Sequence, residues 1–464
     1  MIFNSSLFLF AFLPLALVFY YITPIKVRKY SLLIINFGFY AWYNIKLSLV
    51  LLLISIATYF IGMFIDKNRA KLFWCSFGVM VNLGLLIYFK YMNFFLSQAN
   101  RFFSSQFTLS NIIVPLGISF IVFQSISFLI DSYRKKINKS KLIDVLLYMT
   151  FFAKISSGPI TRYNDFIPSF TFNKFDLDSF EQGLFRFSIG FAKKVILSDT
   201  LGILVDDITV AQPYGISISS AWIMMLAYSL QIYLDFSGYT DMAIGIGNLF
   251  GYKLSENFNY PYISTSLGEF WRRWHISLST WFRDYLYIPL GGSKSGNVYF
   301  NTFIVFLATG LWHGDNWTFL LWGMYHGVLL IVERLIRNTV FYNKTPKLIK
   351  WSSSMIIVAF GWLLFMSPSF NFFVDHLSKM FGFKTFSEIQ MTTTFYLTNK
   401  NIFTLVISSI ASLPISEFLA KHTPQKLPEI FFDSIRYIYS IGLLVISILY
   451  MINSTYSPFI YFQF

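Results

Sequence analysis

The chain has 464 residues, of which 55% are hydrophobic and only 12% are charged. A soluble domain averages about 25% charged residues, so this composition excludes an ordinary soluble protein and predicts one integral membrane domain over residues 1–464. The net charge of +14 lies mostly in short loops between apolar runs, where basic side chains set topology and contact membrane lipids. We therefore expect no nucleic-acid partner.

The first five apolar runs predict membrane spans. They are Ile2–Ile22, Ser31–Ile45, Leu47–Ile65, Leu72–Phe89 and Ile112–Ile130. Lysine and arginine gather in the loops after the first, third and fifth runs, and the positive-inside rule places such loops in the cytoplasm. The N-terminus is therefore expected to lie outside the cell.

The remaining runs are shorter and less regular. The stretch Gly158–Leu197 mixes proline, charges and aromatics, which predicts re-entrant or interfacial helices beside a cavity. Val298–Leu311 and Trp317–Ile331 are each too short to cross hydrocarbon, so the polar turn between them is expected at membrane depth. Three further apolar runs follow later in the sequence. We therefore expect an all-α, polytopic membrane protein of about 11 transmembrane helices.

Three of the five histidines fall within the polar segment Trp271–Gly327, namely His275, His313 and His326. Histidine is suited to proton transfer near neutral pH, and an ionisable residue is costly to bury in a membrane. These residues are therefore candidates for catalysis, whereas the alternative is neutral histidines that hydrogen-bond between helices. We expect His376, like His422, to lie in a loop without a role.

His313 is the strongest of these candidates because it stands at the polar turn. Gly314 allows close approach of the backbone, while Asp315 and Asn316 are candidates to orient the imidazole. Three histidines also raise the question of a metal site, but their spacing supports it weakly, and we expect no metal.

Two further clusters carry charge on apolar segments. Arg272 and Arg273, beside Trp271, are candidates to hold the phosphates of a nucleotide-containing donor, or they extend to lipid headgroups. Asp235 and Asp241, with Ser237 between them, form the second cluster, which is either structural or catalytic. The expected partners of the acids are Arg272, Arg273 or Arg283.

Several ordered motifs resemble the membrane-bound O-acyltransferase (MBOAT) family, and within it the bacterial alginate and peptidoglycan O-acetylase membrane subunits. The motifs are Asp235–Ala243, Asn257–Tyr262, Glu269–Ser279, Leu311–Gly314 and Trp322–Gly327. The resemblance is strongest over Val114–Gly327.

The resemblance implies many helices around a membrane-embedded tunnel, with His313 as the catalytic histidine and His275 as a second family histidine. It implies an acetyl group taken from cytoplasmic acetyl-CoA, a donor substrate, with no permanently bound cofactor. The acceptor would be an extracytoplasmic polysaccharide at the bacterial cell membrane, reached through a separate SGNH-hydrolase-like partner. The alternatives are D-alanyl transfer to teichoic acid, acylation of a lysophospholipid, and a multi-span transporter or flippase.

Overall fold

The computed structural model describes residues 3–67, 69–109, 111–137, 139–169, 175–383, 392–415, 429–453 and 459–460. Within these ranges all regular secondary structure is helical, which confirms the all-α prediction. Contacts divide the chain into two compact units, Met1–Ser188 with Tyr239–Glu256, and Ile189–Gly238 with Asn257–Phe464. The single domain expected over 1–464 stays a prediction.

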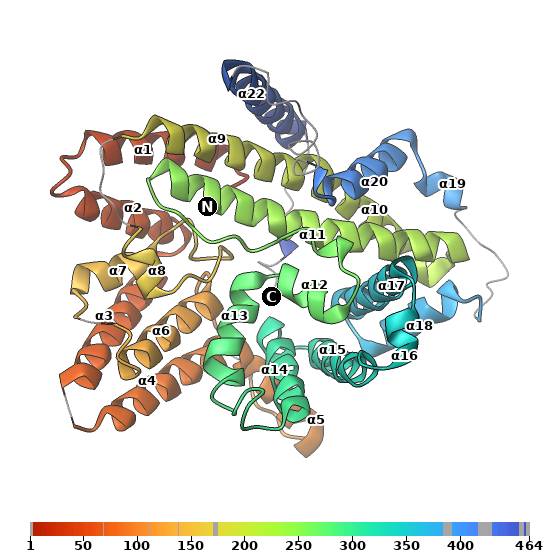
Figure 1. Cartoon of the computed structure of the whole chain (residues 1–464), viewed down its shortest axis with the longest axis horizontal. Helices are drawn as coiled ribbons and strands as arrows, with labels where there is room; N and C mark the ends of the chain where they lie inside the picture. The colour runs from red at the N-terminus through yellow and green to blue at the C-terminus, as the bar shows by residue number, and fades with distance from the viewer. Residues whose placement is uncertain are drawn as a thin grey trace. The chain divides into compact units, whose positions relative to one another are not determined.

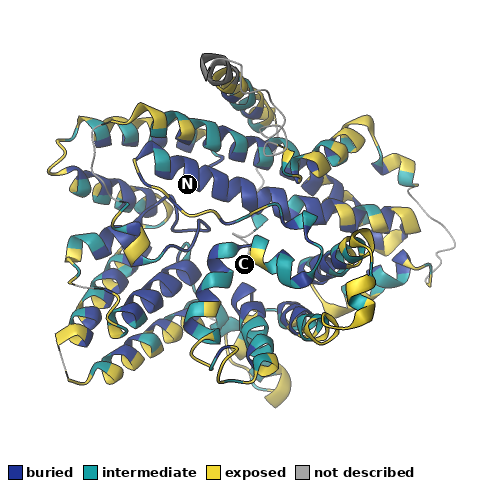
Figure 2. Cartoon of the chain, viewed as in Figure 1, coloured by how far each residue is buried: buried dark blue, intermediate teal, exposed yellow. Residues whose placement is uncertain are grey.

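The first unit has a buried apolar helix at its centre. Helix α6 (Ile118–Tyr133) packs against α3 (Ile45–Lys67) and α4 (Lys71–Leu86), and its residues are buried along most of its length (Figures 1 and 2). A helix that is buried on most sides needs other helices or lipid to enclose it. The other α-helices that the structure describes as beginning in this unit are α1 (Leu13–Ile22), α2 (Arg28–Tyr43), α5 (Met92–Phe103), α7 (Leu142–Thr150), α8 (Tyr163–Phe166) and α9 (Leu177–Ala192).

The second unit holds the segment that carries the three candidate histidines. Its short helices α12 (Leu267–Arg273) and α13 (Ile276–Phe282) meet at His275, and α14 (Val298–His313) ends at His313. Helix α11 (Ile218–Leu249) contributes to both units. The other α-helices that the structure describes in the second unit are α10 (Asp199–Ala211), α15 (Trp317–Ile336), α16 (Val340–Lys344), α17 (Lys347–Met366), α18 (Phe370–Met380), α19 (Thr393–Tyr396), α20 (Asn399–Ala411) and α22 (Glu429–Asn453).

Helices α14 and α15 form a tight hairpin because two glycines let their backbones meet. A Cβ atom on Gly310 would lie 2.4 Å from the carbonyl oxygen of Phe319, and one on Gly323 would lie 2.4 Å from that of Phe306. Small residues at such crossings are typical of helix packing in membranes. The hairpin thereby fixes the end of α14, where His313 stands.

Within the described residues, five helical segments are long and apolar enough to cross a membrane. They are Ile45–Lys67, Lys71–Phe103, Trp317–Ile336, Lys347–Met366 and Arg436–Asn453. The expectation that the run beginning at Trp317 is too short to cross is wrong. Its helix continues for 20 residues through Glu333, because a charged side chain near a helix end can extend to the interface without breaking the helix. The total of about 11 spans stays a prediction.

Candidate active site

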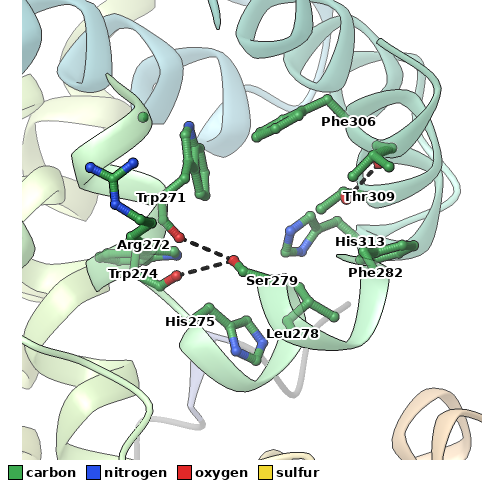
Figure 3. A pocket seen from close by; sticks show the side chains of 12 residues that line it. Trp271, Arg272, Trp274, His275, Leu278, Ser279, Phe282, Phe306, Thr309 and His313 are labelled. Atoms are coloured by element: carbon green, nitrogen blue, oxygen red, sulfur yellow. Dashed lines mark hydrogen bonds between the residues drawn. The ribbon is translucent and has the colours of Figure 1, made fainter. Parts of the chain in front are cut away.

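A cavity of about 220 Å³ lies between α12, α13 and α14, and both His275 and His313 line it (Figure 3). Its wall is mainly aromatic and aliphatic, with a few polar groups. The lining residues are Gly268, Trp271, Arg272, Trp274, His275, Leu278, Ser279, Phe282, Val305, Phe306, Thr309 and His313. Mostly apolar walls with a few convergent polar groups are the usual character of a small-molecule site.

His313 is the last residue of α14, and aromatic rings hold its imidazole. The ring meets those of Trp322 and Phe365 edge to face, each at a centroid distance of 5.0 Å. Gly314, which follows, has no room for a side chain, since a Cβ there would lie 2.3 Å from the Phe319 ring. The packing therefore fixes both the position and the plane of the imidazole.

The two polar residues after Gly314 have other surroundings. Asn316 caps α15, because its side-chain oxygen accepts a hydrogen bond from the Thr318 N–H at 3.2 Å. The same side chain donates to the Pro368 carbonyl oxygen at 2.8 Å, and Asp315 is exposed. The orienting role expected for these residues stays a prediction, while the structure gives Asn316 a part in starting α15.

His275 lies at the elbow between α12 and α13, in a backbone conformation that residues other than glycine rarely adopt. Its φ is 44°, and such strain persists only where the surroundings enforce it. The imidazole is buried, meets Phe236 edge to face at 4.7 Å, and has its Nδ1 3.1 Å from Asn257 Oδ1. Burial lowers the pKa of His275 to about 3, so the imidazole is neutral at physiological pH.

The two adjacent arginines of α12 have different environments. Arg272 lines the cavity together with Trp271. Arg273 instead forms an ion pair with Glu269, Nε to Oε1 at 3.0 Å, and donates to the Asn259 carbonyl oxygen at 3.0 Å. Arg272 thus stays a candidate for donor phosphates, whereas the contacts of Arg273 are those of a residue that holds α12 in place.

The N-terminus of α12 is held by two carboxylates. Glu269 accepts from the Thr265 N–H at 3.0 Å, while Ser266 accepts from the Glu269 N–H at 3.1 Å. From α15, Glu333 accepts from the N–H groups of Leu267 and Gly268, at 2.5 and 3.2 Å. These bonds satisfy backbone N–H groups that have no partner within the helix at its N-terminus. Those from Glu333 also fasten α12 to α15.

His326 supports the wall of the cavity from α15. Its ring contacts Trp271 at 4.9 Å and Trp322 at 5.0 Å between centroids. Neither ring nitrogen has a hydrogen-bond partner among the described residues, and no three metal-ligating side chains gather within that part of the chain. His326 therefore touches one aromatic that lines the cavity and another that packs on His313.

Asp235 and Asp241 pair with cations that the sequence did not indicate. Lys194 contacts Asp235 at 2.7 Å and Asp199 at 2.6 Å, all three buried or nearly so. In the first unit, Arg186 contacts Asp241 at 2.7 Å. The expected pairing with the arginines of the α12 and α13 region is wrong, because folding brings α9 and the helical turn after it to α11. Ser237, between the two acids, is buried.

His376 is a structural residue, and the expectation that it lies in a loop is wrong. It stands in α18, buried, with Nδ1 3.0 Å from Gln212 Oε1 and Nε2 3.1 Å from the Ala221 carbonyl oxygen. Both ring nitrogens are therefore used in packing α18. His422 lies outside the described residues.

The family model for membrane-bound O-acyltransferases matches residues 34–377. The chain belongs to this family. MBOAT membership confirms the resemblance seen in the sequence, makes the chain an O-acyltransferase and gives it a membrane location. The matched range contains every lining residue of the cavity.

Curated relatives to which this MBOAT protein is similar include three kinds of acyltransferase. A probable alginate O-acetylase AlgI of Pseudomonas putida is 37% identical over the full length of both chains. A peptidoglycan O-acetyltransferase of Helicobacter pylori is 32% identical over all of this chain and 98% of its own. A teichoic acid D-alanyltransferase of Bacillus subtilis is 30% identical, over 56% of this chain and 71% of its own.

Proposed function

We propose that this MBOAT protein moves an acetyl group from cytoplasmic acetyl-CoA through the membrane for O-acetylation of an extracytoplasmic polysaccharide. It would act in the bacterial cell membrane, with its N-terminus outside. The observation that carries the proposal is that His275 and His313 line one mostly apolar cavity. The full-length similarity to alginate and peptidoglycan O-acetylases favours acetyl as the group and a polysaccharide as the acceptor.

The chemistry is transfer from a thioester to a hydroxyl group. The hydroxyl oxygen bonds to the acyl carbon, the carbon–sulfur bond breaks, and the hydroxyl proton passes by way of a histidine to the departing thiolate. His313 serves as the general base or stabilises the thiolate, and His275 assists. General-base action contributes typically about 10²–10⁴-fold, and excluding water from the aromatic-lined cavity prevents hydrolysis of the thioester.

The donor and the acceptor would approach from opposite sides of the membrane. Arg272, which lines the cavity, would bind a phosphate of the donor, with which a guanidinium can form two parallel hydrogen bonds. A tunnel between the two faces would let only the small acyl group cross. An extracytoplasmic SGNH-hydrolase-like partner with a serine nucleophile would then carry the group to the glycan.

The second candidate is D-alanyl transfer to teichoic acid, and one observation favours it. The teichoic acid D-alanyltransferase of B. subtilis is 30% identical, although the match covers only 56% of this chain. A transporter or flippase is the less supported alternative, because it leaves the two histidines in one cavity without a role.

The group and the acceptor can be tested in the native cell. The gene for this chain is deleted while its neighbours remain, and the acids released by mild alkali from the extracellular glycans are identified. We expect acetate to be lost on deletion and restored by the wild-type chain. Loss of D-alanine would instead support the second candidate. Unchanged esters of both kinds would contradict acyl transfer.

A further inference from the structure

The side chain of Asn257 has only one orientation that satisfies its neighbours. Its Oδ1 lies 3.1 Å from the Ser277 backbone nitrogen, 2.8 Å from Ser277 Oγ and 3.1 Å from His275 Nδ1. A backbone N–H can only donate, so the atom facing Ser277 must be the amide oxygen and not the amide nitrogen. The hydrogen-bond network therefore decides which end of this amide faces His275.

The orientation of Asn257 decides the tautomer of His275. Since the amide oxygen only accepts, Nδ1 of the imidazole must carry the proton and donate it. A neutral imidazole with a proton on Nδ1 has its lone pair on Nε2. His275 is one of the residues that line the cavity (Figure 3).

The backbone around Asn257 holds the same arrangement. The Ile276 N–H donates to the Asn257 carbonyl oxygen at 2.9 Å, and the Asn259 N–H donates to the Arg273 carbonyl oxygen at 3.0 Å. Backbone hydrogen bonds of Asn257 and Asn259 thus hold the chain on both sides of His275. These bonds maintain the left-handed φ of His275 and leave its ring little freedom to turn.

We propose that Asn257 is a positioning residue that fixes His275 as the Nδ1–H tautomer, so that Nε2 accepts a hydrogen bond from the hydroxyl group that receives the acyl group. The identity of that hydroxyl group rests on the proposed acyl transfer. The tautomer of His275 rests only on its hydrogen bond to Asn257. It assigns His275 to the acceptor, because a thioester has no hydrogen to donate to Nε2. Asn257 was named in the sequence only as part of a motif, since nothing in its spacing of 18 residues from His275 indicates contact.

The tautomer can be measured without any substrate. The purified full chain is labelled with ¹⁵N-histidine in a lipid nanodisc, and the His275 signals are identified by their loss in His275→Gln. We expect a protonated Nδ1 and an unprotonated Nε2 in the wild type. In Asn257→Leu the fixed tautomer should give way to a mixture. An Nε2–H tautomer in the wild type, or an unchanged Nδ1–H tautomer in Asn257→Leu, would overturn the proposal whatever reaction the protein catalyses.

The pH dependence of acyl transfer separates positioning from mere stability. In Asn257→Asp the carboxylate still accepts from Nδ1–H, so the turnover rate should largely survive, whereas Asn257→Leu should lower it with little change in KM for the donor. The new negative charge favours the imidazolium and raises the pKa of His275, by about 1–3 units for a close carboxylate. Because only neutral His275 accepts at Nε2, the acidic limb of the rate profile should move to higher pH.

Two other ionisable groups line the cavity and must be considered in that profile. They are Arg272 and the second imidazole, His313; the α11 residue that contacts the His275 ring, Phe236, does not titrate. Asn259→Asp is the matched control, since it adds the same charge two residues away, beside Arg273 at 3.4 Å. A profile of Asn257→Asp that superimposes on those of the wild type and the control would contradict the proposal.

Discussion

At the residue scale, the candidate site depends on aromatic contacts more than on charge. The two cavity histidines are held by Trp322, Phe365 and Phe236, edge to face. Such contacts contribute about 0.5–1.5 kcal/mol beyond the burial of their area. They hold each imidazole in one orientation.

Gly361 provides a test of the packing behind the cavity. A Cβ at this position would lie 2.4 Å from His326 Nε2, so Gly361→Ala must displace His326 and with it Trp271. Overpacking of this kind costs about 1–3 kcal/mol, and we expect a lower melting temperature together with a lower acyl-transfer rate. Gly442→Ala is the control, because nothing lies within 4 Å of its added Cβ. Equal stability and rate in the two variants would contradict this account of the wall.

Some residues of the site were predictable from the sequence, and others were not. His275 and His313 stood out because histidine is rare and costly in apolar segments. Asn257 and Glu333 were missed, since their roles depend on chain segments that meet only after folding. The partners of Asp235 and Asp241 were predicted wrongly for the same reason, because the arginines considered in the sequence are not those that folding brings near.

At the element scale, the short helix α12 carries Arg272 to the cavity and leads into His275. Seven residues do not make a stable helix alone, so its ends must be held. Glu333 from α15 accepts hydrogen bonds at the N-terminus of α12, and backbone hydrogen bonds of Asn257 and Asn259 hold its C-terminal end. The sequence predicted α14 well from its apolar run, but it ended α15 too early because Glu333 and Arg334 interrupt the hydropathy there.

The role of Glu333 predicts a specific defect. Glu333→Gln removes the negative charge that accepts from the Leu267 and Gly268 N–H groups, and loss of such a cap costs about 0.5–2 kcal/mol. We expect α12 to become more accessible to hydrogen exchange and acyl transfer to slow, while α3 keeps its protection. Asp66→Asn, an exposed acid at the end of α3, is the control for charge alone. Unchanged exchange in α12 would show that the cap does not hold it.

At the scale of the whole molecule, each unit has its own ion pairs. The first contains the Arg186–Asp241 ion pair and the second contains the cavity and the Lys194 cluster. Composition and hydropathy were enough to predict a helical membrane protein, because long apolar segments recur along the sequence, five of them as helices within the described residues. They could not define the cavity, which is built by three helices that are short or only partly apolar.

The most direct test of acyl transfer at the two histidines is the ester-linked acetate on extracellular glycans in cells that carry His313→Gln. The native partner genes stay in place, and the amount of each variant in the membrane is measured. We expect the ester to fall by about 10²–10⁴-fold at equal protein level, as for the loss of a general base. His376→Gln, which removes a buried histidine that does not line the cavity, should keep the ester wherever its protein level holds. Wild-type acetylation in His313→Gln at equal protein level would contradict the account.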